Sequence, residues 1–140
     1  DMKPVHVPGP VGRASTIKMI RSVLVKGIEA LTAECFSAAT IAGVADEVAA
    51  SLDASQTKDG WKHQAAYNME RMTTHGIRRA AEMREVAITL ADLNIAGRMT
   101  TGTIAWQDQL GHLGLSLLDT EGLEPRFSAI HSALDNKKSD

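Results

Sequence analysis

The sequence has little proline, cysteine or aromatic residue, and each shortage limits the possible folds. Its four prolines stand at positions 4, 8, 10 and 125, so no proline interrupts a helix between residues 11 and 124. The one cysteine, Cys35, excludes an internal disulfide and a multi-cysteine zinc site, and it favours a reducing, cytoplasmic location. No apolar run approaches the roughly 20 residues of a membrane span. The first residue is Asp1 and no signal-peptide pattern follows it, so we expect neither a signal peptide nor a membrane partner.

The composition favours one helical domain. The chain has 140 residues, of which 44% are hydrophobic and 23% charged, which suits a packed core. Aromatic residues make up only 4%, and the abundance of alanine favours helix over strand. The formal net charge of −2 excludes a nucleic-acid partner bound through overall positive charge. We therefore predict an all-α fold, a multi-helix bundle around a long first helix.

Proline, glycine and hydrophobic spacing divide the chain. Residues 1–12 are predicted to be an extended lead-in, residues 13–135 the helical domain, and residues 136–140 a frayed tail. Apolar residues spaced by three or four predict that the first helix is central and largely buried, with Ser15 or Thr16 as its N-cap. The expected helices cover residues 13–42, 44–52, 57–75, 77–94, 99–118 and 124–134.

A polar stripe on the first helix is the most informative chemical pattern. Lys18, Ser22, Lys26 and Glu29 follow one another at helical spacing, so they share one face. A lysine on an otherwise apolar helix must reach water or an anionic partner such as a substrate carboxylate, and its pKa can fall. The alternative is an ordinary solvated face, which is the commoner meaning of such stripes.

A second polar cluster occupies residues 75–86, HGIRRAAEMREV. Arg78, Arg79 and Arg84 are the kind of residues that bind carboxylates or phosphates through paired contacts. The alternative is a surface helix with weak internal ion pairs. No histidine cluster predicts a metal site, and no glycine-rich strand–turn–helix unit predicts dinucleotide binding by this chain itself.

Two stretches resemble the helical C-terminal domain of the β-hydroxyacid dehydrogenase superfamily, which includes 3-hydroxyisobutyrate and 6-phosphogluconate dehydrogenases. In GRASTIKMIRSVLVKGIEALTAE, residues 12–34, Gly12, Lys18 and Glu34 are in register with the family pattern. In AAEMREVAITLADLNIAGRM, residues 80–99, Arg84 and Glu85 replace the family's Lys-Asp pair. The resemblance covers roughly residues 9–116 and extends to the phosphogluconate-dehydrogenase-like branch.

The resemblance implies an oxidoreductase that acts on a small anionic β-hydroxy acid, with or without decarboxylation. Lys18 would be the catalytic proton-transfer group, and Ser22 would bind substrate in place of the family's asparagine, with Lys26 or Arg21 compensating for its shorter reach. Arg84 would lie near the cofactor, NAD or NADP.

The same resemblance implies that an N-terminal dinucleotide-binding domain holds most of the cofactor, that this chain alone is inactive, and that it forms a homodimer. The alternative is a non-catalytic helical module for self-association. A G-x-G-x-x-G strand–helix unit upstream of Asp1 in the parent reading frame would favour the enzyme.

Overall fold

The computed structural model describes residues 9–56 and 58–140, except for the side chains of residues 20, 22, 23 and 25. All the regular structure in these residues is α-helical, as predicted. The helices are α1 (Arg13–Ile41), α2 (Ala45–Ser55), α3 (Trp61–Asp92), α4 (Arg98–Gly111) and α5 (Leu123–Lys138). No described helix combines the length and the apolar character needed to cross a membrane.

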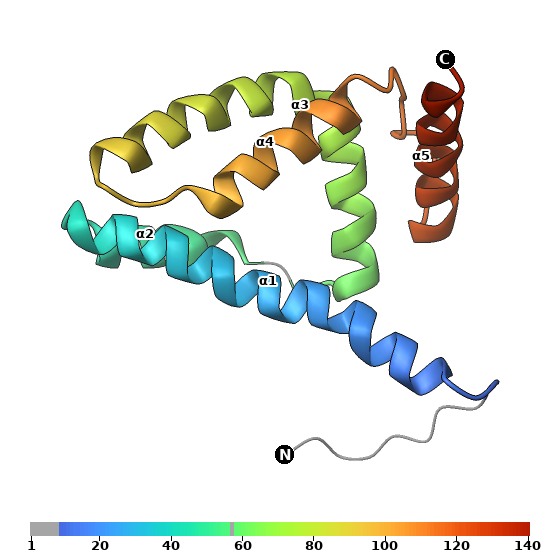
Figure 1. Cartoon of the computed structure of the whole chain (residues 1–140), viewed down its shortest axis with the longest axis horizontal. Coiled ribbons are helices and arrows are strands. Elements are labelled where there is room, and N and C mark those ends of the chain that lie inside the picture. Colours follow the sequence, from blue (N-terminus) through green and yellow to red (C-terminus); the bar gives the residue numbers. More distant parts are fainter. Residues whose placement is uncertain (1–8, 57) are drawn as a thin grey trace.

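The closest helix pair is α3 and α4, which cross at two glycines (Figure 1). A Cβ atom on Gly76 would stand 2.1 Å from the carbonyl oxygen of Gln107, and one on Gly111 would stand 2.5 Å from the nitrogen of Ile77. Only glycine lets the two backbones approach this closely. The sequence predicted a break at Gly76, which is wrong, because Gly76 belongs to the crossing and α3 continues through it for 32 residues in all.

The helix α3 changes direction near its middle, so that its two halves serve different neighbours (Figure 1). Just before Gly76, the hydroxyl of Thr73 donates to the carbonyl oxygens of Met69 and Glu70, at 3.0 and 3.1 Å. Threonine bonds of this kind and glycine are both known causes of helix bending. The first half of α3 lies beside α5, and the second half passes over the end where α1 meets α2.

The hydrophobic core lies between α3, α4 and α5. Leu110, Leu117 and Ile130 are its most deeply buried members, and Met69 and Met72 of α3 pack against them. Leu117 is buried although α4 ends at Gly111, seven residues before the predicted boundary at 118. The connection after α4 therefore folds back under α5 and brings Leu117 into the core. A longer α4 would have placed Leu117 elsewhere.

Polar contacts fix both ends of α5. Arg126 donates from Nε to the carbonyl oxygen of Thr120 and from a terminal nitrogen to that of Ala66, both at 2.6 Å. At the other end, Lys137 Nζ donates to the carbonyl oxygen of His112 at 2.5 Å. The predicted frayed tail from residue 136 is helical through Lys138, because the two terminal lysines favour the negative end of the helix dipole.

The first helix is not central, which corrects the prediction. It contacts α2 and α4, while its N-terminal half projects beyond the rest of the molecule (Figure 1). Ile17, Leu24, Ile28 and Leu31 are between 41% and 49% exposed. The helix α3 takes the central place instead, because its glycine crossing and methionines pack against two partners.

Smaller boundary predictions also change. The first helix begins at Arg13, after Gly12 in the left-handed conformation, and Thr16 Oγ1 donates to the Gly12 carbonyl at 3.1 Å instead of capping the helix. Trp61 is the first residue of α3 and is 64% exposed. At a helix terminus no preceding turn exists to cover such a side chain.

Candidate functional site

The predicted polar stripe lies on the N-terminal half of α1, on the face opposite the helix's apolar residues. At about 100° per residue, Lys18, Lys26 and Glu29 are turned roughly 140° to 160° away from Leu31. All three side chains are exposed. The predicted residue Ser22 lies outside the described side chains.

The basic residues on this half of α1 do not border the pockets described below. Lys18, Arg21 and Lys26 line none of the four pockets that we find in the described residues. Arg21 is exposed and flanks the apolar face. The placement of Lys18 in a substrate site therefore stays a prediction.

The predicted arginine cluster on α3 is divided between two flanks of the helix. Arg78 forms an ion pair with Glu82 one turn later, while Arg84 reaches α4, where its guanidinium lies 3.7 Å from the Asp108 carboxylate. Arg79 and Arg84 are five residues apart and thus about 140° apart around the axis. The cluster does not act as one site, because adjacent positions in sequence point to different sides of a helix.

The structure also separates Arg84 from the Lys18 stripe. The N-terminal half of α1 and the C-terminal half of α3 lie at opposite ends of the molecule (Figure 1). Within one chain, these two residues cannot border the same small substrate.

A histidine lies among the arginines of the other flank. Desolvation, followed by the charges of Arg71, Arg78 and Arg79, lowers the pKa of His75, and Glu70 acts in the opposite direction. The imidazole is therefore neutral at neutral pH. No group of three or more His, Cys, Asp or Glu side chains suited to a metal ion occurs in the described part of the chain.

Glu34, in register with the family pattern, joins α1 to α4. Its two carboxylate oxygens accept hydrogen bonds from the Met99 and Thr100 amides, both at 2.8 Å, and from the Thr100 hydroxyl at 2.7 Å. Desolvation raises the pKa of Glu34, but these hydrogen bonds outweigh it and hold the pKa below its ordinary value. Gly97 precedes α4 and has no side chain to cap it, so Glu34 supplies the cap from another helix.

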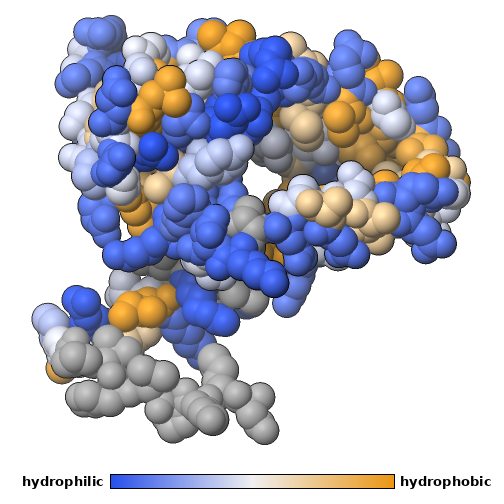
Figure 2. Space-filling view, turned by 180° about the vertical axis from the view of Figure 1, so that it is seen from behind, coloured by the Kyte–Doolittle hydropathy of each residue, from blue (hydrophilic) through white to orange (hydrophobic). Residues whose placement is uncertain are grey.

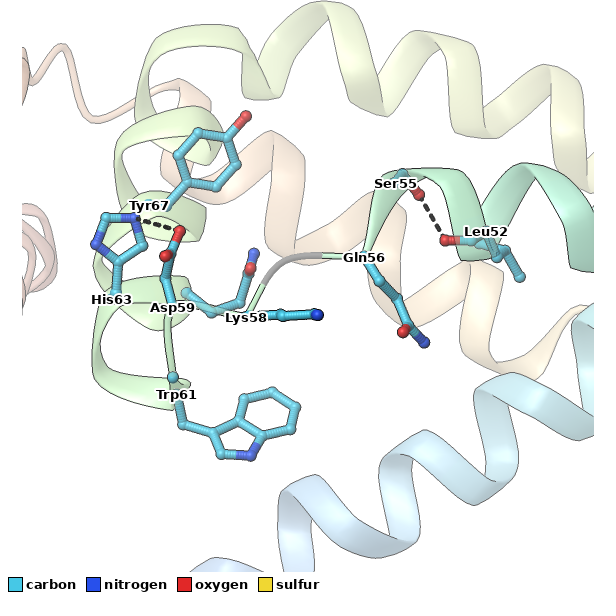
Figure 3. Close-up of a pocket in the computed structure, with 10 residues that line it drawn as sticks. Leu52, Ser55, Gln56, Lys58, Asp59, Trp61, His63 and Tyr67 are labelled. Carbon is cyan, nitrogen blue, oxygen red and sulfur yellow. Dashed lines mark hydrogen bonds and ion pairs between the residues drawn. The ribbon is translucent and has the colours of Figure 1, made fainter.

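An open hollow of about 930 Å³ lies where α2 leads into α3 (Figure 3). Lys58 and Trp61 point into its space, and His63 Nε2 lies 3.7 Å from an Asp59 carboxylate oxygen. No role was predicted for the residues that line this hollow. The feature of the sequence that could have indicated this hollow is a tryptophan directly after a glycine at the start of a helix, because a side chain at that place is incompletely buried.

A second, apolar groove of about 420 Å³ runs between the C-terminal half of α1, α2 and the second half of α3. Leu31, Cys35 and Ala38 of α1 face Met83 and Val86 of α3 across it. Figure 2 shows hydrophobic residues gathered on the right-hand side of the molecule, where these helix ends meet, and an opening through its centre. The arm formed by α1 and α2 is thus incompletely covered.

The comparisons identify a family. The chain belongs to the family described as a domain of unknown function (DUF1932), whose model matches residues 39–110. The match runs from the end of α1 to the end of α4 and includes Arg84, but it excludes Lys18, Arg21, Ser22 and Lys26.

One solved structure also resembles the chain, a conserved hypothetical protein from Sinorhizobium meliloti 1021. It is 31% identical over 91% of this chain, with a TM-score of 0.47. This chain spans 43% of the length of that protein. No curated protein matches the chain.

Proposed function

We propose that this chain is the substrate-binding and dimerisation domain of an NAD(P)-dependent dehydrogenase acting on a β-hydroxy acid. The observation that carries the proposal is the polar face of α1. Lys18, which the resemblance matches to the superfamily's catalytic lysine, lies in a helix whose N-terminal half has an exposed polar face and an exposed apolar face. One face is suited to an anionic substrate, and the other to a protein neighbour.

Lys18 would transfer the proton of the substrate hydroxyl. Its amine must be close to that oxygen and must exchange a proton with it while the substrate carbon is oxidised. Lys26 or Arg21 would hold the substrate carboxylate, since each lies within about 80° of Lys18 around the axis of α1. Ser22 would contribute one hydroxyl to the same substrate.

The nicotinamide cofactor, when bound, accepts the hydride. This chain has no glycine-rich phosphate-binding turn between a strand and a helix, so a domain outside these residues would hold most of the cofactor. Arg84 is the residue expected near it. Its ion pair with Asp108 engages only part of a guanidinium with five donors, so it retains donors for an anion.

The test is Lys18→Ala in the protein joined to its dinucleotide domain. We expect kcat to fall by on the order of a hundredfold, the usual contribution of a general acid–base group. Lys138→Ala is the matched control, because it removes an exposed lysine near the end of α5. Activity of the Lys18 variant within about threefold of the wild type would reject the role.

A second candidate is a helical module that only mediates self-association. The exposed apolar face of α1 favours it. If this candidate is correct, Lys18→Ala leaves the oligomer unchanged and no hydroxy acid is turned over by the joined protein.

A further inference from the structure

One apolar stripe runs along the whole of α1. Ile17, Leu24, Ile28 and Leu31 in its first part share an arc of about 80° with Cys35, Ala38 and Ala42 in its second part. The second part lines the apolar groove, where α2 and α3 cover it partly. Among the described residues, no other helix covers the first part in this way. The stripe is therefore one surface, of which the described residues bury only one end.

Charge is segregated along the same arm. Residues 9–26 contain four basic residues and no acidic residue, whereas residues 27–55 contain five acidic residues and no basic residue. The basic segment is the projecting half of α1, and the acidic segment is the other half together with α2. Arg13 and Arg21, like Glu47 and Asp53, form no ion pair within the described residues.

We propose that a second copy of this chain covers the stripe, with the two α1 helices antiparallel about a two-fold axis near Ile28 and Leu31. In that arrangement the basic half of each α1 lies along the acidic half and α2 of the other copy. The exposed Ile17 and Leu24 of one copy meet the groove end of the other. A two-fold interface repeats each contact, so the basic half and the acidic half of both α1 helices are paired with opposite charges at the same time.

The charge pattern selects this occupant and this direction. Parallel helices would place basic segments against each other and acidic segments against each other, which is unfavourable. A different protein would need the inverse arrangement of charges beside a matching apolar stripe. A second copy has both, since each half of the arm is complementary to the other half.

The pairing deepens the homodimer of the proposed function and rests on that homodimer. The projecting half of one α1 would lie at the groove end of the other copy, against Met83 and Val86 of its α3.

Charge reversal tests the pairing. Variant one is Arg13→Glu with Arg21→Glu, and variant two is Glu47→Lys with Asp53→Lys. Each variant alone places like charges across both halves of the two-fold interface. We expect the dimer dissociation constant, measured by sedimentation, to rise by at least about tenfold for each variant alone. An equimolar mixture of the two should recover the wild-type affinity, because every contact in the mixed dimer is again between opposite charges.

The control variant carries Asp119→Lys with Glu121→Lys, the same change in net charge as variant two, at exposed positions between α4 and α5. It should dimerise like the wild type. Circular dichroism verifies that each variant stays helical. Lysine at position 53, in the last turn of α2, favours the helix dipole and offsets the cost of lysine at position 47.

The outcomes separate the pairing from the proposed function. A wild-type chain that stays monomeric at micromolar concentration overturns the pairing and the homodimer together. A stable dimer that neither variant weakens, or that the control weakens equally, overturns the pairing and leaves the homodimer. A mixture that does not recover affinity also rejects the antiparallel arrangement. The catalytic role of Lys18 is decided by kcat and not by these measurements.

Discussion

At the scale of single residues, Glu34 has the clearest structural task. It accepts three hydrogen bonds at the start of α4, and it is the polar link between the arm of α1 and α2 and the remaining helices. A carboxylate is suited to this place because it faces the positive end of the helix dipole.

Replacing this carboxylate should weaken the fold. Glu34→Gln keeps the shape but removes the charge and leaves one acceptor oxygen for three donors. We expect the free energy of unfolding to fall by about 1–2 kcal/mol, measured by chemical denaturation. Glu85→Gln, on the exposed surface of α3, is the control and should change it by less than about 0.5 kcal/mol.

The effect of Glu34→Gln should depend on pH. The folded state lowers the pKa of Glu34, so the folded state binds fewer protons there than the unfolded state does. Its contribution to stability is fully present above the ordinary glutamate pKa. It is lost as the pH falls through the lowered folded-state pKa. The difference between wild type and variant should therefore shrink in acid, and a constant difference would contradict the assigned hydrogen bonds.

At the scale of elements, two glycines determine how the helices meet. Without their Cβ atoms, α3 and α4 approach until backbone contacts backbone, and the bend of α3 follows at the same place. Spacing alone predicted that Gly76 ends a helix, because a glycine after a helical pattern commonly does so. The partner that makes Gly76 helical lies about thirty residues later in the chain and has no local signal.

Gly76→Ala should separate these two helices. Alanine is the better helix former, yet its Cβ would meet the Gln107 carbonyl oxygen at 2.1 Å. We expect the free energy of unfolding to fall by about 1–3 kcal/mol, as for an overpacked core.

Gly102→Ala is the matched control within α4. Nothing lies within 4 Å of its added Cβ, so the better helix propensity should raise stability by up to about 1 kcal/mol. Equal effects of the two substitutions on thermal or chemical unfolding would show that the crossing does not constrain position 76.

At the scale of the whole molecule, the chain divides into a packed body and a less covered arm. The body of α3, α4 and α5 holds the core, whereas α1 and α2 attach through Glu34 and the edge of the groove. The proposed dimer would cover the arm, and the proposed catalytic residues lie on its open polar face.

The chain of residues 1–140 by itself should be helical and bind no nicotinamide cofactor. We expect a helical circular dichroism spectrum and no heat of binding when NAD or NADP is titrated at micromolar concentrations. The reason is that hydride transfer needs a dinucleotide held at contact distance, and this chain lacks the turn that binds its phosphates. Micromolar affinity for either cofactor, or turnover of a hydroxy acid, would overturn the proposed division between domains.

The sequence by itself determined the all-α class and the existence of α1, α2 and α5. Helix propensity and hydrophobic spacing act within a few residues, so the local sequence is sufficient to predict these helices. The continuity of α3, the exposure of α1, the Glu34 cap and the division of the arginines were decided by tertiary structure. The continuity of α3, the Glu34 cap and the division of the arginines depend on contacts between segments far apart in the chain. The exposure of α1 follows from the small number of such contacts that its N-terminal half makes among the described residues.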